Sequence, residues 1–156
     1  MWINRWRKYR DILDVTHEEE RRARAAYYAL VETLDAMVGR VLNKLEDLGL
    51  ADNTLVVYAS DHGEQIGERG LWWKHTFFEE SVRVPLLMRL PGVLPAAERR
   101  EQIVSLVDVT ATILDAMNAP KLPGADGQSF LSIAKNPDVP WHNTAYSEYC
   151  YGSQFD

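Results

Sequence analysis

The most chemically distinctive part of the sequence is YASDHGEQIGERGLWWKHTFFEES, residues 58–81. It places Asp61 and His62 side by side, with Lys74 and His75 a short way downstream. A carboxylate oxygen and a neutral imidazole nitrogen both bind divalent cations, and adjacent loop residues can turn both side chains to one side. Lys74 adds a fixed cation suited to an anionic oxygen. The stretch therefore predicts a metal ion, a lysine and a bound anion in one site.

The Asp-His pair directly follows an apolar segment, TLVVYAS, at residues 54–60. The segment does not alternate and is rich in β-branched residues, which predicts a strand buried on both faces of a parallel sheet. In open α/β sheets, ligands bind outside the carboxyl ends of the strands, which is where Asp61 lies. An isolated Asp-His pair more often caps a turn. Gly63 and the downstream glycines allow close backbone approach and favour the ligand site.

A long helix is predicted before this strand. Thr16 and Glu19 have the spacing of a capping box, and Gly49 supplies a C-terminal stop. Apolar residues recur at steps of four and three and share one face: Tyr27, Val31, Leu34, Val38, Val41, Leu45 and Leu48. The heptad-like spacing also suits a coiled-coil dimer. Gly39, which is unfavourable inside a helix, favours a helix lying on a sheet instead.

The remaining elements are predicted from shorter patterns. Residues 82–90 read as a second strand, with Pro85 at its start or on an edge. Asp108 is the expected N-cap of a helix through about residue 118. A short helix at 129–134 and a last strand at 144–151 follow. The residues expected to face the core from the Asp108 helix are Val109, Ile113, Ala116 and Met117.

Composition limits the class of protein. The 156 residues are 46% hydrophobic and carry a net charge of −6, which suits one domain over 1–156 and argues against nucleic acid or an anionic membrane as main partner. Residues 1–15 form a basic lead-in that either binds a phosphate or bilayer surface or packs against another part of a longer chain. The single cysteine, Cys150, cannot form an internal disulfide, which favours a cytoplasmic location, with a periplasmic or secreted full-length protein as the alternative.

A family resemblance covers most of the chain. Residues 53–92, NTLVVYASDHGEQIGERGLWWKHTFFEESVRVPLLMRLPG, resemble the C-terminal half of the sulfatase family in the alkaline-phosphatase-like superfamily, especially its choline sulfatase and phosphonate monoester hydrolase branch. The preceding helix and the segments SLVDVTATILDAMNAP and GADGQSFL extend the resemblance to residues 20–135. It implies an α/β fold: a three-layer sandwich with a mostly parallel sheet, of which this chain is the C-terminal portion.

The resemblance implies a metal-dependent sulfuric ester hydrolase acting on a small anionic ester. Asp61 and His62 match the family's metal ligands, usually for calcium and in some relatives manganese or zinc. Lys74 matches the lysine that holds a sulfate oxygen. His75 either donates to the leaving group or is solvated, and Glu64 either orients His62 or faces solvent. The alternatives are a phosphonate or phosphate diester hydrolase, or a non-catalytic binding or assembly fragment.

The chain also departs from the family pattern. The family's nucleophile lies in a Cys/Ser-x-Pro-x-Arg segment and is converted to formylglycine, but no such segment occurs here, and Cys150 lacks the proline and arginine. The strand that carries the other acidic metal ligands is also missing. We therefore expect little turnover by the isolated chain, and association of its incomplete sheet with itself or with a missing N-terminal half.

An aromatic group accompanies the site: Trp72, Trp73, Phe77 and Phe78. Its ring faces would suit the trimethylammonium group of choline through cation–π attraction. The alternative is that these rings form core or interface surface. The sequence leaves both interpretations open.

Overall fold

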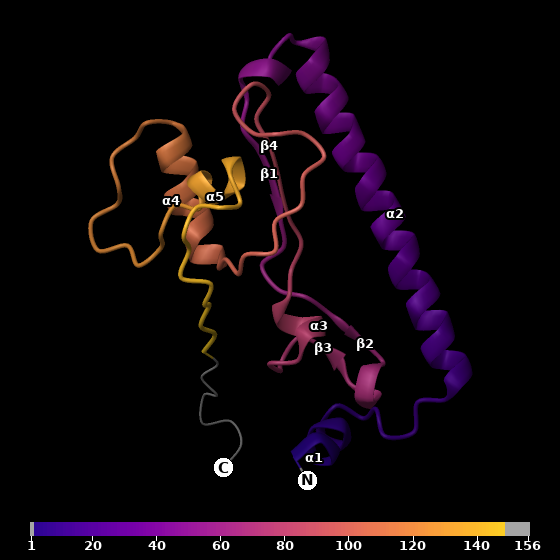
Figure 1. Cartoon of the computed structure of the whole chain (residues 1–156). Coiled ribbons are helices and arrows are strands. Elements are labelled where there is room, and N and C mark those ends of the chain that lie inside the picture. Colours follow the sequence, from indigo (N-terminus) through magenta and orange to yellow (C-terminus); the bar gives the residue numbers. More distant parts are fainter. Residues whose placement is uncertain (1, 149–156) are drawn as a thin grey trace. The chain divides into compact units, whose positions relative to one another are not determined.

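The computed structural model of the chain describes residues 2–148 and groups them into two units (Figure 1). The first unit consists of the described part of Met1–Ala51 together with Ala59–Leu86. The second consists of Asp52–Tyr58 and the described part of Leu87–Asp156. The single domain expected over 1–156 stays a prediction, and each unit is described by itself.

The first unit contains most of the helical residues and a small antiparallel hairpin. Its elements are α1 (Trp2–Tyr9), α2 (His17–Asp47), β2 (Gln65–Ile66), the 3-10 turn η2 (Glu68–Gly70), β3 (Trp72–Trp73) and α3 (Glu79–Val82). Gln65 pairs with Trp73 and Ile66 with Trp72. The hairpin contacts α2, and Arg24 of that helix donates from Nε to the Ile66 carbonyl at 2.7 Å.

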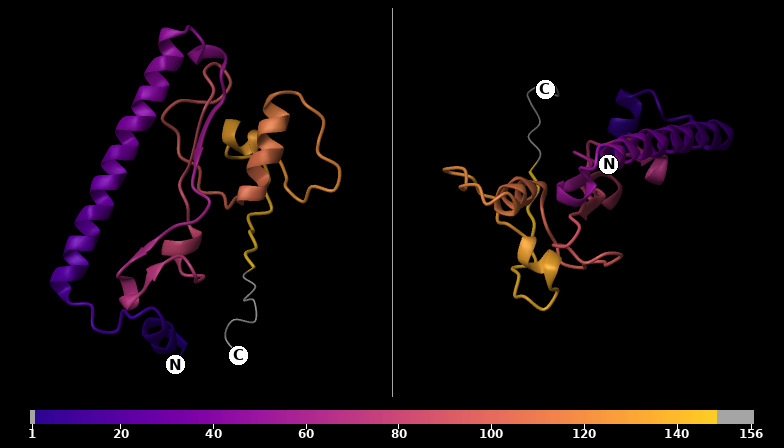
Figure 2. Two further views of the ribbon diagram at one scale, coloured as in Figure 1. Left: turned by 180° about the vertical axis from the view of Figure 1, so that it is seen from behind. Right: turned by 90° about the horizontal axis from the view of Figure 1, so that it is seen from above.

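Helix α2 begins and ends as its sequence predicts. The Glu19 amide lies 3.3 Å from Thr16 Oγ1, and the Thr16 amide donates to Glu19 Oε2 at 2.9 Å, which completes the capping box. Gly49, at φ +65°, follows the helix in the left-handed conformation that glycine adopts without strain. Figure 2 shows α2 as one uninterrupted helix. The predicted long helix is confirmed.

The expected burial of the apolar stripe on α2 is wrong for most of its length. No described residue of the helix is buried, Val38 and Leu45 are half-buried, and Val41 remains 68% exposed. The physical reason is size. A helix of 31 residues is about 46 Å long, whereas the hairpin that contacts it in the same unit has strands of only two residues each.

The second sheet is also small. Its strands are β1 (Val56–Ala59) and β4 (Leu86–Arg89), which pair with each other, and η1 (Ala51–Asn53) precedes β1. The two-sided burial expected for residues 54–60 is wrong, because none of the β1 residues is buried and Ala59 is exposed. The predicted strand at 82–90 starts later than expected, since Val82 belongs to α3. Strand β4 follows Pro85, as the missing amide hydrogen of proline requires.

Helices α4 (Leu106–Ala116) and α5 (Leu131–Lys135) contact each other in the second unit (Figure 1). The expected N-cap of α4 is wrong: Ser105 caps the helix, and Asp108 is its third residue. Asp108 is only 5% exposed and accepts from the Ser105 amide and from the Gln128 amide, both at 2.8 Å. The buried carboxylate therefore joins the helix start to the following loop.

The core of the second unit lies where α4 meets α5. Phe130, Leu131 and Ile133 are buried, and the fully buried Thr112 of α4 accepts from the Phe130 amide at 3.0 Å. Met117 was expected to face inward, but it is 68% exposed because it lies beyond the last turn of α4.

The C-terminal strand expected at residues 144–151 is wrong for its first part. Residues 144–148 form no regular element, and residues 149–151, with Cys150, lie outside the described residues. Across residues 2–148, no helix combines the length and apolarity needed to cross a bilayer.

Candidate functional site

The loop that carries Asp61 and His62 is held in place by Gly63. The Gly63 amide donates to the Ser81 carbonyl at 2.8 Å. A Cβ atom at position 63 would overlap the Glu80 carbonyl oxygen and lie 2.9 Å from the Glu80 carbonyl carbon. Only glycine allows this approach of the loop to α3. The glycine that follows the Asp-His pair thus fixes the backbone from which His62 projects.

Both ring nitrogens of His62 have partners that define the same tautomer. Nδ1 lies 2.8 Å from the Gly63 carbonyl oxygen, which can only accept a hydrogen bond. Nε2 lies 2.6 Å from Lys74 Nζ, which as an ammonium can only donate. His62 therefore carries its hydrogen on Nδ1, and its Nε2 lone pair accepts from Lys74, which a metal ion at Nε2 would have to displace. A backbone carbonyl on Nδ1 is the usual partner of a histidine that binds metal through Nε2.

Asp61 lies on the same side of the loop. Its Oδ1 accepts from the His62 amide at 3.0 Å, and its Oδ2 is 3.5 Å from His62 Nε2. The Asp61 side chain is 85% exposed and that of His62 34% exposed, so a solute can reach both. One carboxylate oxygen, one imidazole nitrogen and the Lys74 ammonium therefore converge, as the sequence predicted for these residue types.

The donor set fits part of a metal site. Asp61 and His62 offer an oxygen and a nitrogen of the kinds that calcium, manganese or zinc accept. Among residues 2–148 there is no group of three or more His, Cys, Asp and Glu side chains arranged to hold a metal ion. The described chain thus supplies two ligands of an incomplete shell, and the assignment of Asp61 and His62 to a metal stays a prediction.

Lys74 reaches His62 because the chain turns sharply after β3. Trp73 has φ +68°, a left-handed conformation that is uncommon outside glycine and redirects the chain at that residue. Behind this turn, fully buried Gln65 donates from Nε2 to Thr76 Oγ1 at 3.0 Å, and that hydroxyl lies 3.0 Å from Ser81 Oγ. These bonds join the hairpin to α3 on both sides of Lys74.

His75 packs against the N-terminal segment. Its ring centroid lies 5.2 Å from that of Trp6, and its Nε2 lies 3.5 Å from an Arg10 guanidinium nitrogen. Burial, followed by the positive charges of Arg10, Lys74 and His62, lowers the pKa of His75 below its usual range. His75 is therefore half-buried rather than freely solvated, and its donation to a leaving group stays a prediction.

Glu64 does not orient His62. The two ring nitrogens of His62 contact Gly63 and Lys74 instead. The other role open from the sequence, an acid that faces solvent, stays a prediction, since Glu64 is half-buried.

Sequence reasoning missed that the basic lead-in folds onto this site. Residues 2–9 form α1, Trp6 is 8% exposed, and Trp2 stacks on Phe78 at 6.4 Å between ring centroids. The available signal was the spacing of Trp2, Trp6 and Arg10, since residues four apart share one helix face. The aromatic group at 72–78 is accordingly part of a contact with α1.

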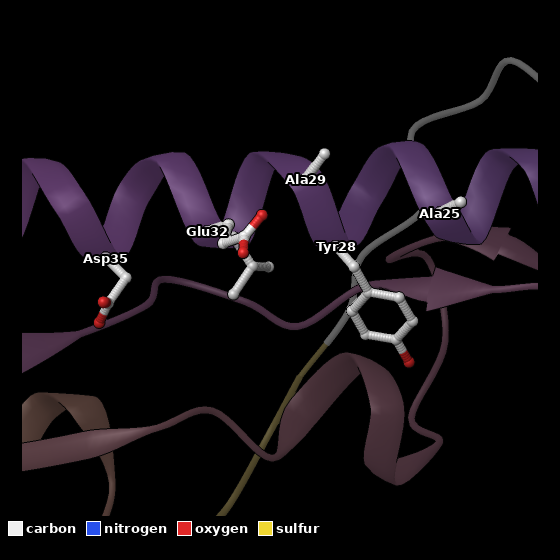
Figure 3. A pocket seen from close by; sticks show the side chains of 6 residues that line it. Ala25, Tyr28, Ala29, Glu32 and Asp35 are labelled. Atoms are coloured by element: carbon white, nitrogen blue, oxygen red, sulfur yellow. The ribbon is translucent and has the colours of Figure 1, made fainter.

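A shallow pocket along α2 is separate from these residues (Figure 3). It is lined by Ala25, Tyr28, Ala29, Val31, Glu32 and Asp35. None of the four predicted site residues contributes to it. Two carboxylates in its lining make it a poor receptor for an anionic ester.

Comparison with known proteins identifies the family. The family model described as Sulfatase matches residues 3–119 of this chain. The chain belongs to the sulfatase family. A choline-sulfatase of Rhizobium meliloti (strain 1021) is 45% identical over 102 residues, which cover 65% of this chain and 20% of that protein. The sulfatase resemblance inferred from residues 53–92 is thereby confirmed.

Solved structures support the same fold. A phosphonate monoester hydrolase from Silicibacter pomeroyi matches with a TM-score of 0.77 and 32% identity, over 82% of this chain and 25% of that one. A protein solved in complex with its substrate D-glucosamine-2-N,6-O-disulfate matches with a TM-score of 0.74 and 31% identity, over 85% of this chain and 28% of that one. The described residues are thus a portion of an alkaline-phosphatase-like α/β fold. The chain spans a fifth to about a quarter of the length of the curated relatives that it matches.

Proposed function

We propose that this chain forms part of a metal-dependent sulfuric ester hydrolase. In this proposal Asp61 and His62 bind a divalent ion, calcium in the first instance, and Lys74 holds an anionic oxygen of the ester. The substrate is a small sulfate ester. The nucleophile is not among these 156 residues, because they contain no Cys/Ser-x-Pro-x-Arg segment, so another part of the enzyme must provide it.

The observation that carries the proposal is the 2.6 Å approach of Lys74 Nζ to His62 Nε2. Two residues twelve positions apart meet at a solvent-accessible point, with the Asp61 carboxylate 3.5 Å from the same nitrogen. A surface lysine gains little from such an arrangement by itself, since holding a long side chain costs conformational entropy. A role in binding an anionic oxygen accounts for the position of Lys74, which must release His62 Nε2 when a metal ion binds there.

The roles follow from the chemistry of each group. A bound divalent ion polarises the ester oxygens and lowers the pKa of a bound nucleophile. The Gly63 carbonyl keeps the His62 hydrogen on Nδ1 and so leaves the lone pair on Nε2. The Asp61 carboxylate, which accepts from the His62 amide, lies beside that ring. The Lys74 ammonium offsets the negative charge that develops as the ester bond breaks.

A phosphonate or phosphate diester hydrolase is the second candidate. The similarity to the phosphonate monoester hydrolase from Silicibacter pomeroyi favours it. A lysine and a divalent ion serve either tetrahedral oxyanion, because neither group reads the identity of the central atom.

Titration of the chain with calcium chloride, and separately with manganese chloride, tests the proposed metal site. For calcium, we expect changes in the NMR signals of the His62 ring and the Asp61 amide. Asp61→Asn should weaken binding about tenfold or more, because the amide oxygen that replaces the carboxylate carries no negative charge. Asp138→Asn is the matched control, since Asp138 is an exposed aspartate of the second unit.

Ion-induced changes that spare both residues, or an Asp61→Asn variant with unchanged affinity, would contradict the proposal. That outcome would favour the non-catalytic binding or assembly fragment. Manganese provides a second readout, because its paramagnetism broadens signals of residues close to the bound ion.

A further inference from the structure

Arg10 is an arginine with its flat faces covered and no acidic partner. Its guanidinium carbon lies 4.8 Å from the centroid of the Trp6 ring, 5.6 Å from that of Tyr9 and 5.2 Å from that of Trp73. Among residues 2–148, the guanidinium group has one hydrogen-bond contact, His75 Nε2 at 3.5 Å. Across residues 2–148, no carboxylate lies within ion-pair distance of Arg10.

Arg69, in the same unit, also packs on an aromatic ring, but it has an acidic partner. The Arg69 guanidinium lies 4.1 Å from the centroid of the Phe78 ring, but its Nη1 also lies 2.8 Å from both carboxylate oxygens of Glu80. Its charge is therefore neutralised. The charge of Arg10 is held in place by aromatic rings, and no carboxylate of the described residues pairs with it.

Arg10 belongs to the same charged surface as Lys74. His75 is adjacent to Lys74 in sequence and contacts Arg10 in space, and both cations lower its pKa. Because that shift favours the neutral imidazole, His75 does not replace either cation. Two fixed positive charges thus lie around His75, and only one of them is used in the proposed function.

The arrangement is poorly suited to a quaternary ammonium group. Trimethylammonium recognition needs aromatic faces that are open to a cation. A face of Trp73 already carries the Arg10 guanidinium, and Phe78 carries Arg69 and stacks on Trp2. A second cation brought to these rings would meet like charge.

We propose that Arg10 is a specificity-determining residue that binds a second oxyanion on the substrate, such as another sulfate or a carboxylate, outside the ester that Lys74 holds. This inference rests on the proposed function. It names the substrate class as sulfate esters of anionic sugars rather than of choline. A guanidinium edge can bind such a group through two parallel N–H donors, while its faces stay on the rings.

The test compares three probes on the 156-residue chain in calcium chloride: N-acetylglucosamine 6-sulfate, D-glucosamine-2-N,6-O-disulfate and choline sulfate. Dissociation constants come from NMR titration, with the Arg10 Nε–H and the Trp73 indole signals as local reporters. We expect the disulfate to bind about three- to tenfold more tightly than the monosulfate. Choline sulfate should bind most weakly.

The variants separate this inference from the proposed function. Arg10→Gln should abolish the preference for the disulfate and leave monosulfate binding unchanged, and Arg10→Lys should retain part of the preference. Arg40→Gln, at an exposed arginine of α2, is the control and should change neither. Retention of the indole shift of Trp2, which stacks on Phe78, in each variant would show that α1 stays docked.

Equal affinity of the wild-type chain for both sugar esters would overturn the inference and leave the proposed function intact. Tighter binding of choline sulfate than of the disulfate would do the same. If none of the three esters bound, both proposals would fail together.

Discussion

Replacement of Gly63 by alanine tests whether the loop that carries the site depends on close backbone contact. The added Cβ would overlap the Glu80 carbonyl oxygen and lie 2.9 Å from its carbon and 3.3 Å from the Ser81 carbonyl carbon. These are backbone atoms, so no flexible side chain can move aside. The loop or the start of α3 must shift, and the 2.8 Å hydrogen bond from the Gly63 amide to Ser81 must lengthen.

The expected cost is the sum of two effects. Inserting a methyl group into a filled space costs about 1–3 kcal/mol, and losing a backbone hydrogen bond costs about 1 kcal/mol more. The free energy of unfolding should therefore fall by about 2–4 kcal/mol. Gly39→Ala is the matched control, because a Cβ there has nothing within 4 Å. Inside α2 that change should stabilise by about 0.5–1 kcal/mol.

Urea unfolding followed by tryptophan fluorescence measures both changes, since four of the five tryptophans lie in the first unit. The midpoint should fall for Gly63→Ala and rise slightly for Gly39→Ala. His62 provides a second readout, because the displaced Gly63 carbonyl no longer fixes the hydrogen on Nδ1. An unchanged midpoint for Gly63→Ala, alongside the expected rise for Gly39→Ala, would refute the packing argument.

Three further predictions concern other features of the chain. Asp108→Ala should lower the free energy of unfolding by about 2–4 kcal/mol in urea titrations, because two backbone amides lose a nearly buried acceptor; a loss below 0.5 kcal/mol would contradict this. His75 has a lowered pKa, so the unfolded chain binds its proton first, and stability should fall as the pH drops below about 6.5. His75→Gln should flatten that dependence in urea midpoints, and an equal slope would refute it. The chain should self-associate at micromolar concentration through exposed α2 residues such as Leu30 and Val41, each 68% exposed, and light scattering of a stable monomer would exclude this.

The features that could be predicted from the sequence are those set by neighbouring residues. The start of α2 depends on Thr16 and Glu19, which are three positions apart, and its end depends on the left-handed conformation of Gly49. The start of β4 after Pro85 follows from the missing amide hydrogen. Such local rules act within one or two turns of chain and need no tertiary partner.

The features that could not be predicted depend on residues far apart. Asp108 has a side chain that suits an N-cap, yet Ser105 takes that position because Asp108 also accepts from the amide of Gln128. Likewise, the docking of α1 depends on Trp6 meeting His75, and no short-range pattern encodes that contact. The predicted burial of the apolar stripe on α2 was wrong for a related reason. Periodicity identifies an apolar face of a helix but not the size of the surface that packs against it.

The candidate site could be predicted only in part from the sequence. The residue types of Asp61, His62 and Lys74 indicated the chemistry that is proposed for them, but the twelve-residue separation of His62 and Lys74 gave no distance. That distance is set by the left-handed turn at Trp73 and by the approach of Gly63 to Glu80. Both are backbone features whose consequences appear only once the hairpin is folded.

The meeting of His62 and Lys74 is a property of the local loop rather than of a large sheet. The contacts that hold it lie within a short stretch: Gly63 to Ser81, Gln65 to Thr76, and Thr76 to Ser81. Small elements with buried hydrogen bonds can be rigid without a large apolar core, because each buried polar group left without a partner would cost free energy. The arrangement of His62 and Lys74 should therefore not depend on contacts outside this stretch, which makes binding experiments on the 156-residue chain informative about the proposed site.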